Sequence, residues 1–64
     1  MTRRITIARD GTVRLNGRAT RWEAGWVDLK LWGVWRPNGE RSFGGTLAAA
    51  RAYLATLTDE ELRG

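Results

Sequence analysis

The sequence contains neither cysteine nor histidine, and this double absence limits what a chain of 64 residues can fold into. Disulfide bonds and the usual zinc-ligand sets, which hold many small domains together, are both excluded. A chain of about 60 residues buries only roughly 60% of the surface that it exposes when unfolded. Residues 1–64 are therefore expected to form a single domain whose core is built from apolar side chains. Self-association is the remaining way in which such a small domain could gain stability.

The amino-terminal segment 1–5 carries charge but no long apolar run behind it. It therefore lacks the pattern of a signal peptide. No other segment approaches the ~20 apolar residues that are needed to span a bilayer. The sequence predicts a soluble, cytoplasmic protein that makes no membrane contact.

Turn residues divide the first part of the chain into short strands. Apolar residues alternate at positions 5, 7, 13 and 15 around Asp10-Gly11, the pair typical of a two-residue type I′ hairpin turn. Asn16-Gly17 is a second turn of the same kind. A short strand over 18–23, ended by Ala24-Gly25, is expected to follow.

The segment 26–35 gives the strongest strand prediction. Val27, Leu29 and Leu31 occupy alternate positions, so their face is expected to point to the core. A bulge at Gly33 would change the faces of the residues that follow it. The opposite face is expected to carry Trp26, Asp28, Lys30, Trp32 and Val34, with Arg36 next.

The last part of the chain predicts a turn, a strand and a helix. Pro37 and Asn38-Gly39 favour a turn before a strand over 41–44. Thr46 suits the N-cap of a helix over 47–57, and a capping box over 58–61 opens one more helical turn. The predicted core is Leu29, Leu31, Phe43, Leu47, Leu54 and Leu57. Because the strands precede the helix, we expect an α+β fold with a small antiparallel sheet of 3–5 strands and one C-terminal helix packed on one face.

A single helix covers one face of such a sheet, so the other face meets solvent or a partner. Of the four tryptophans, Trp22 and Trp35 are assigned to the core or its rim, and Trp26 and Trp32 to the open face. Tryptophan and arginine together are typical of binding hot spots and of base-stacking surfaces. Alternatively, the rings pack over arginine stems and shield a thin sheet. The candidate binding residues are Arg14, Arg18, Arg21, Trp26, Lys30, Trp32, Arg36 and Arg41.

The charge is basic and uneven along the chain. Residues 1–57 carry ten positive and four negative side chains, whereas residues 58–64 carry one positive and three negative ones. Ten of the eleven cations are arginine, whose guanidinium group forks onto phosphates and guanine edges. The positive excess indicates a polyanionic partner. Alternatively, the preference for arginine over lysine reflects the codon usage of a GC-rich genome.

No set of residues in the sequence supports catalysis. Nucleophile–base pairs of the Ser-His or Cys-His kind are excluded by composition, and Ser42 is the only serine. Glu23 and Asp28 are interpreted as surface charges rather than as a catalytic pair. We expect no enzymatic activity, no metal, no cofactor and no small-molecule substrate.

Residues from Gly25 onward resemble a DNA-binding pattern. The matching segments are Gly25-Trp26-Val27, Trp35-Arg36-Pro37-Asn38-Gly39-Glu40-Arg41, Phe43-Gly44-Gly45-Thr46 and Ala49-Ala50-Arg51-Ala52-Tyr53-Leu54. Together they resemble the small DNA-binding domain at the amino end of tyrosine-recombinase integrases, and the plant ethylene-response-factor domain. The resemblance implies a three-stranded sheet backed by one helix, with the open face of the sheet in the DNA major groove.

The sequence departs from these domains in its short connection before the helix and in its acidic Asp28. The catalytic domain that follows this unit in an integrase is also missing from residues 1–64. The resemblance therefore implies a free-standing phage or mobile-element protein, acting in the cytoplasm of a bacterial or phage-infected cell.

The sequence is compatible with two main functions, and RNA binding is a third alternative. The first is a non-catalytic DNA-binding module whose open-face cations contact phosphates or bases, while Trp26 and Trp32 pack against sugars or thymine methyls. The second is a protein-interaction module, either a phage-type inhibitor of a host protein or a homodimer that buries the tryptophan face. Asp28 counts against DNA because phosphate repels it, unless it accepts from a cytosine amino group or orients an arginine.

Overall fold

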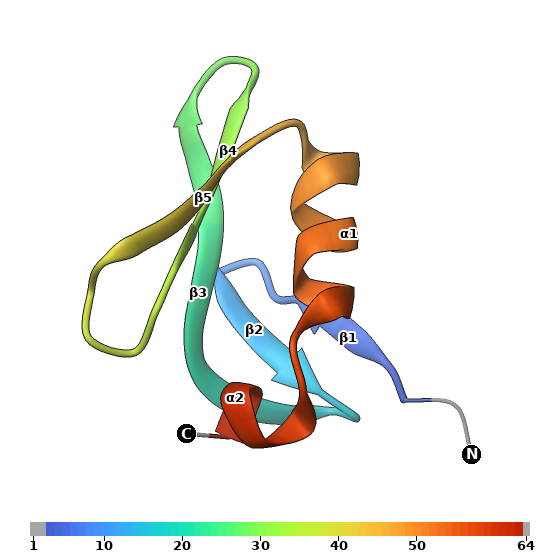
Figure 1. The fold of residues 1–64 in the computed structure, drawn as a ribbon. Coiled ribbons are helices and arrows are strands. Elements are labelled where there is room, and N and C mark those ends of the chain that lie inside the picture. The colour runs from blue at the N-terminus through green and yellow to red at the C-terminus, as the bar shows by residue number, and fades with distance from the viewer. Residues whose placement is uncertain (1–2, 64) are drawn as a thin grey trace.

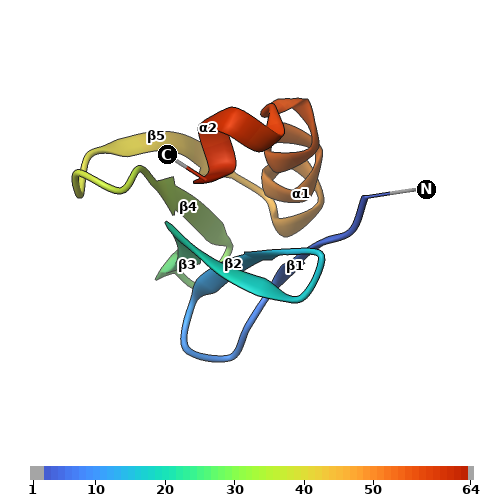
Figure 2. The same cartoon turned by 90° about the horizontal axis from the view of Figure 1, so that it is seen from below.

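The structure is a computed structural model that describes residues 3–63, and it contains a five-stranded antiparallel sheet followed by two short helices (Figure 1). Each strand pairs with the next one along the chain, in the order β1-β2-β3-β4-β5. Both helices lie on the same side of the strongly twisted sheet (Figure 2). The predicted α+β fold is confirmed, with a second helix added. The elements are β1 (Ile5–Ile7), β2 (Thr12–Leu15), β3 (Arg18–Asp28), β4 (Leu31–Trp35), β5 (Arg41–Gly45), α1 (Leu47–Thr56) and α2 (Asp59–Arg63).

The first hairpin, β1–β2, is confirmed, but its turn is one residue longer than predicted. The Gly11 N–H donates to the Ala8 carbonyl at 3.0 Å, and the Ala8 N–H donates to the Thr12 carbonyl at 2.8 Å. Gly11 has a φ of 94°, so the loop is a three-residue turn ending in a glycine bulge. The Asp10 carboxylate accepts the Thr12 N–H at 2.9 Å, and this hydrogen bond lowers the pKa of Asp10.

The Asn16-Gly17 turn between β2 and β3 is confirmed as a two-residue type I′ turn. Asn16 and Gly17 have φ values of 53° and 82°, as this turn type requires at both central positions. Leu15 and Arg18 are paired on either side of the turn. This turn fixes the register of the long strand β3.

The prediction of two strands over 18–23 and 26–35 is wrong. Strand β3 runs through Ala24-Gly25 without a break, and the chain reverses at Leu29-Lys30 instead. The Asp28 carboxylate accepts the Lys30 N–H at 3.1 Å, so an aspartate side chain supports this turn without a glycine. Because the reversal falls inside the predicted strand, the face alternation assigned to that segment does not hold.

The core lies between the sheet and the two helices. Its buried side chains come from β2, β3, β4, both helices and the C-cap of α1; they are Val13, Leu15, Trp22, Ala24, Val34, Ala50, Leu54, Leu57 and Leu62. Phe43 is half-buried and stacks on Tyr53 with ring centroids 4.9 Å apart. Of the six residues predicted for the core, three are wrong. Leu29 is 94% exposed, Leu31 is half-buried on the other face of the sheet, and Leu47 is half-buried outside the core cluster.

Both helices begin at the threonines that the sequence predicts. The Thr46 hydroxyl accepts the Ala49 N–H at 3.1 Å, which satisfies a free donor at the start of α1. In the capping box of α2, the Thr58 N–H donates to Glu61 Oε1 at 3.0 Å and the Glu61 N–H donates to the Thr58 hydroxyl at 3.1 Å. The hydrogen bond from the Thr58 backbone lowers the pKa of Glu61. Within residues 3–63, neither helix has the length and apolar character needed to cross a membrane.

Candidate binding surfaces

Strand β3 divides the side chains between two faces of the sheet, which we name by what covers them. The helix face carries the buried Trp22 and Ala24. By alternation, the next residue on that face is Trp26, and the residues between them point to the open face. Directly opposed strand residues share a face, so the pairing of Glu23 with Trp35 assigns Trp35 to the open face.

Trp26 and Trp32 do not lie on the open face, contrary to the sequence prediction. They are paired across β3 and β4, and their ring centroids are 4.7 Å apart. Trp32 packs against the core, and its indole nitrogen is buried with no hydrogen-bond partner within residues 3–63. Trp26 is 62% exposed. The predicted surface that combines these two rings with the arginines of the open face is therefore absent.

Trp35, expected at the core or its rim, covers part of the open face. A Cβ atom on Gly33 would lie 2.9 Å from the Trp35 ring and 2.9 Å from the Val27 side chain, so Trp35 lies across Gly33 towards Val27. Gly33 is paired with Gly25 and Gly44 on the two neighbouring strands. Of the three glycines in this row, Gly33 is the one that leaves room for the half-buried indole.

The predicted cations fall on three parts of the molecule. Arg14, Arg21 and Arg41 lie on the open face: Arg14 opposite Ala19 in β3, and Arg41 opposite Trp35. Arg18 and Arg36 lie at the margin of the helix face, since Arg18 is paired with the buried Leu15. The Arg36 guanidinium carbon is 5.8 Å from the centroid of the Trp22 ring. Lys30 lies apart, in the β3–β4 turn.

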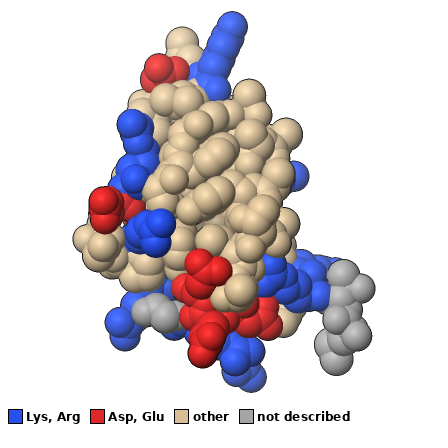
Figure 3. Space-filling model, in the orientation of Figure 1, with Lys and Arg blue, Asp and Glu red and all other residues tan. Residues whose placement is uncertain are grey.

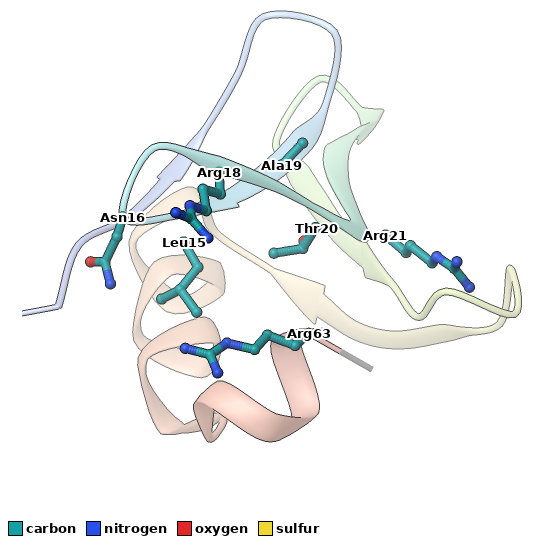
Figure 4. A pocket seen from close by; sticks show the side chains of 7 residues that line it. All are labelled: Leu15, Asn16, Arg18, Ala19, Thr20, Arg21 and Arg63. Carbon is teal, nitrogen blue, oxygen red and sulfur yellow. The ribbon is translucent and has the colours of Figure 1, made fainter.

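Two adjoining grooves connect most of these arginines. The first, of about 540 Å³, lies between the β2–β3 turn and α2, and Arg18, Arg21 and Arg63 line it (Figure 4). The second, of about 270 Å³, lies beside the β4–β5 turn and is lined by Arg21, Arg36 and the Trp35 ring, among others. Arg21 lines both grooves and so joins them. We use the name arginine band for the arginines that line the two grooves together with Arg14 and Arg41 on the open face; its members are Arg14, Arg18, Arg21, Arg36, Arg41 and Arg63.

The arginine band has little internal charge compensation. The ion pair recorded within residues 3–63 joins Arg3 to Asp59 at 2.8 Å, outside the band. No guanidinium group of the band makes a hydrogen bond to another residue of the described chain. Glu23 is the one carboxylate that lines the two grooves. The acidic side chains over α2 gather on the lower part of the surface in Figure 3, with basic side chains beside them. Arg14 near Asp10 and Arg36 near Glu61 add an attraction to the hydrogen bonds that lower the pKa of these two carboxyl groups, so two members of the band are partly compensated. The band therefore carries an excess of positive charge.

A second surface is formed by the β3–β4 hairpin, which extends past the start of α1 (Figure 1). Trp26, Val27 and Leu29 are 62%, 41% and 94% exposed. We call these three residues the hairpin tip. The charged Asp28 and Lys30 flank Leu29 in the turn. Trp26 and Leu29 line one shallow pocket, whereas Val27 faces the other side of the sheet beside Trp35. Exposed large apolar side chains that lie together are typical of interaction surfaces.

Comparison with known proteins finds no protein family, no curated protein and no solved structure that matches this chain. The resemblance to integrase and ethylene-response-factor domains therefore stays a prediction. No group of three or more Asp or Glu side chains is placed to hold a metal ion within residues 3–63.

Sequence reasoning missed Trp35 and Arg63 as candidate site residues. Arg63 stands in the acidic tail, and nothing in the sequence indicates that α2 folds back beside the β2–β3 turn. The position of Trp35 follows from the reversal of the chain between β3 and β4. Asp28 could have indicated this reversal in the sequence, because aspartate is a common first residue of a tight turn.

Proposed function

We propose that this protein binds double-stranded DNA through the arginine band. The supporting observation is that Arg18, Arg21, Arg36 and Arg63, from β3, the β4–β5 turn and α2, line two adjoining grooves, with Arg14 and Arg41 on the open face; no salt bridge is found for any of the six within residues 3–63. Arginine forks match phosphate oxygens bidentately. Phosphate contacts supply most of the affinity of such a surface, and they weaken steeply as the salt concentration rises.

The residues of the band have different roles in this proposal. Arg14, Arg21 and Arg41 project from the open face and contact the phosphate backbone or guanine edges. Trp35 lies between Glu23 and Arg41 on the neighbouring strands and offers its indole ring to sugars or bases. Glu23 lies in the same groove, where it orients the neighbouring arginines or accepts from a cytosine amino group. Asp28, which counted against DNA in the sequence, lies in the hairpin turn away from the band.

The test is a salt series of duplex binding for the parent protein and for single charge-removing variants. Arg21→Gln and Arg41→Gln are each expected to weaken binding and to reduce the log–log salt slope by about one. Lys30→Gln removes the same charge from the hairpin turn and serves as the matched control, with a small effect on affinity. Equal effects of Lys30→Gln and Arg21→Gln would contradict the assignment to the arginine band. Affinity weaker than roughly 10⁻⁵ M for every duplex at physiological salt, which is ordinary non-specific binding, would contradict the function.

The hairpin tip supports a second function, docking on a protein. Other apolar residues outside the core are half-buried because they pack against it, whereas Leu29 and Trp26 remain largely exposed. A second copy of this chain is one such protein and a host protein is another. The tip and the arginine band are separate surfaces, so the two functions are compatible with each other and can be tested one at a time.

A further inference from the structure

Arg18 and Arg63 come from distant parts of the chain and line the same groove. Arg18 begins β3, directly after the β2–β3 turn, and Arg63 ends α2. Figure 4 shows their side chains on either side of Leu15, whereas Arg21, which also lines the groove, extends away along the sheet. Leu15 is 5% exposed, so an apolar core residue underlies the two guanidinium groups. Charges over such an apolar base are screened less than they are in open water.

The polar neighbours of this groove differ in their free hydrogen-bonding capacity. The Asn16 side-chain carbonyl accepts the Arg4 N–H at 2.8 Å, which orients the carboxamide and leaves its NH₂ group as a donor. The Thr20 hydroxyl donates to the Val13 carbonyl at 2.7 Å and accepts the Trp22 N–H at 3.2 Å, so it is already engaged. The free groups around the groove are therefore donors.

The groove is chemically one-sided. Its lining contains three arginines and no carboxylate. The first turn of α2 carries Asp59, Glu60 and Glu61 in the same helix as Arg63. Asp59 is paired with Arg3, Glu61 is engaged in the capping box, and Glu60 is exposed and does not line the groove. Two like charges that face one space repel each other, and an anion between them removes this cost while gaining charge-assisted hydrogen bonds.

We propose that this groove is a phosphate-binding site, in which Arg18 and Arg63 hold one phosphate group and the Asn16 amide donates to it from the rim. The ligand class is a phosphate anion, supplied either by a nucleic-acid backbone or as a free phosphate. Its assignment to a backbone phosphate rests on the proposed DNA-binding function, whereas the site itself does not. The groove lies at one end of the arginine band and would anchor a strand that continues past Arg21.

The direct test is a titration with inorganic phosphate at pH 7 and constant ionic strength, followed by NMR of arginine and asparagine side chains. Without histidine, the chain has no side chain that normally titrates near this pH. Saturable shifts are expected at Arg18, Arg63 and Asn16. Arg18→Gln and Arg63→Gln should each reduce the affinity on the order of tenfold, the equivalent of one charge-assisted hydrogen bond. Arg51→Gln, on the exposed side of α1, is the matched control and should bind as the parent does.

A second arm with duplex DNA separates this site from the proposed function. Competition between duplex and phosphate at the same side chains supports a backbone phosphate. Saturable phosphate binding without any duplex binding supports the site with a free phosphate as its ligand, and it contradicts the proposed function. The phosphate site is overturned if phosphate gives no saturable shift. It is also overturned if Arg18→Gln and Arg63→Gln bind phosphate as tightly as Arg51→Gln does. In either case, duplex binding by the parent protein would still support the proposed DNA-binding function. The side chains at 18 and 63 are exposed, so these variants are expected to fold, and dispersed amide spectra check this.

Discussion

Trp22 and Trp26 share one face of β3 but meet opposite environments. Trp22 is 3% exposed, and its indole N–H donates to the Glu61 carbonyl at 2.9 Å, so it joins the sheet to α2. Trp26, four residues further along, lies where the helices no longer cover the strand and is 62% exposed. The number of tryptophans in the sequence therefore says little about which of them are buried. Burial is decided by the length of sheet that two short helices can cover.

Leu54→Ala and Leu31→Ala are expected to differ strongly in stability. Leu54 is 1% exposed, so its truncation opens a cavity in the core and costs about 2–5 kcal/mol, a large fraction of the stability of a small domain. Leu31 is half-buried on the open face, where the sheet relaxes around the loss and the cost stays near 1 kcal/mol. Urea unfolding of both variants measures the difference. Equal destabilisation would mean that the two faces of β4 are wrongly assigned.

Gly33→Ala and Gly25→Ala form a matched pair on the glycine row. A Cβ at position 33 meets the Trp35 ring at 2.9 Å, so Gly33→Ala is expected to lift the ring and to cost about 1 kcal/mol or more. A Cβ at position 25 has nothing within 4 Å, and alanine there restricts the unfolded chain, with a gain of about 0.4–1 kcal/mol. Thermal melts give the stabilities, and the NMR signal of the Trp35 indole N–H reports the ring. A neutral Gly33→Ala variant with an unchanged Trp35 indole signal would contradict the position of Trp35.

At the scale of elements, the predictions that rest on turn and capping chemistry hold. The Asn16-Gly17 turn and the two helix starts at Thr46 and Thr58 appear as predicted, and the β1–β2 hairpin appears with a turn one residue longer than predicted. Each depends on local backbone requirements that particular residues meet. The strand prediction over 26–35 fails because Asp28-Leu29-Lys30 carries no glycine or proline, and its turn is supported by one side-chain hydrogen bond.

The wrong strand prediction over 26–35 also limits how much of the candidate site can be predicted from the sequence. The arginines are visible in the sequence, but the face that each one occupies depends on which alternate residues of its strand point to the helices. The sequence prediction gave the helix face to Val27, Leu29 and Leu31, whereas Trp32 and Val34 occupy it in β4. The groove between Arg18 and Arg63 depends on the packing of α2 against β3, a long-range contact that no local pattern encodes.

The capping box of α2 predicts a weakening of this helix in acid. The folded-state pKa of Glu61 lies below its ordinary value of 4.5 because the Thr58 backbone N–H donates to its carboxylate. A lowered pKa gives stability that is fully present above pH 4.5 and is lost as the pH falls through the folded-state pKa. Glu61→Gln keeps an acceptor but does not titrate, so its α2 amides should show less pH dependence than those of the parent between pH 6 and 3. Parallel curves for the two proteins would assign the acid response elsewhere, Asp10 being the other carboxylate with a lowered pKa.

At the scale of the whole molecule, the two proposed surfaces lie at different ends of the sheet. The arginine band surrounds the β2–β3 and β4–β5 turns, and the hairpin tip lies at the β3–β4 turn. Adjacent strands run antiparallel, so alternate turns of the sheet fall at opposite ends. A protein built in this way presents a cationic end to one partner and an apolar end to another.

This arrangement predicts that self-association and duplex binding respond to different substitutions. Leu29→Ser removes the most exposed apolar side chain of the tip, so it is expected to leave the stability within about 0.5 kcal/mol of the parent and the duplex affinity unchanged. If the tip is a homodimer contact, sedimentation equilibrium will show a dimer for the parent and a monomer for Leu29→Ser. A parent that is monomeric at every concentration would exclude the homodimer and leave a different protein as the docking partner.

The sequential order of the strands also has a consequence for how the chain reaches its structure. Every strand pairs with the one before or after it, through turns that hold the partners close together in sequence. Chains dominated by such local pairings fold faster than sheets of the same size whose strands come together from distant segments. The contact from Trp22 to Glu61 spans 39 residues, and closing so long a loop carries a greater entropy cost. We therefore expect the hairpins to form first and α2 to dock last, so the phosphate groove, which needs Arg63, is completed at the end of folding.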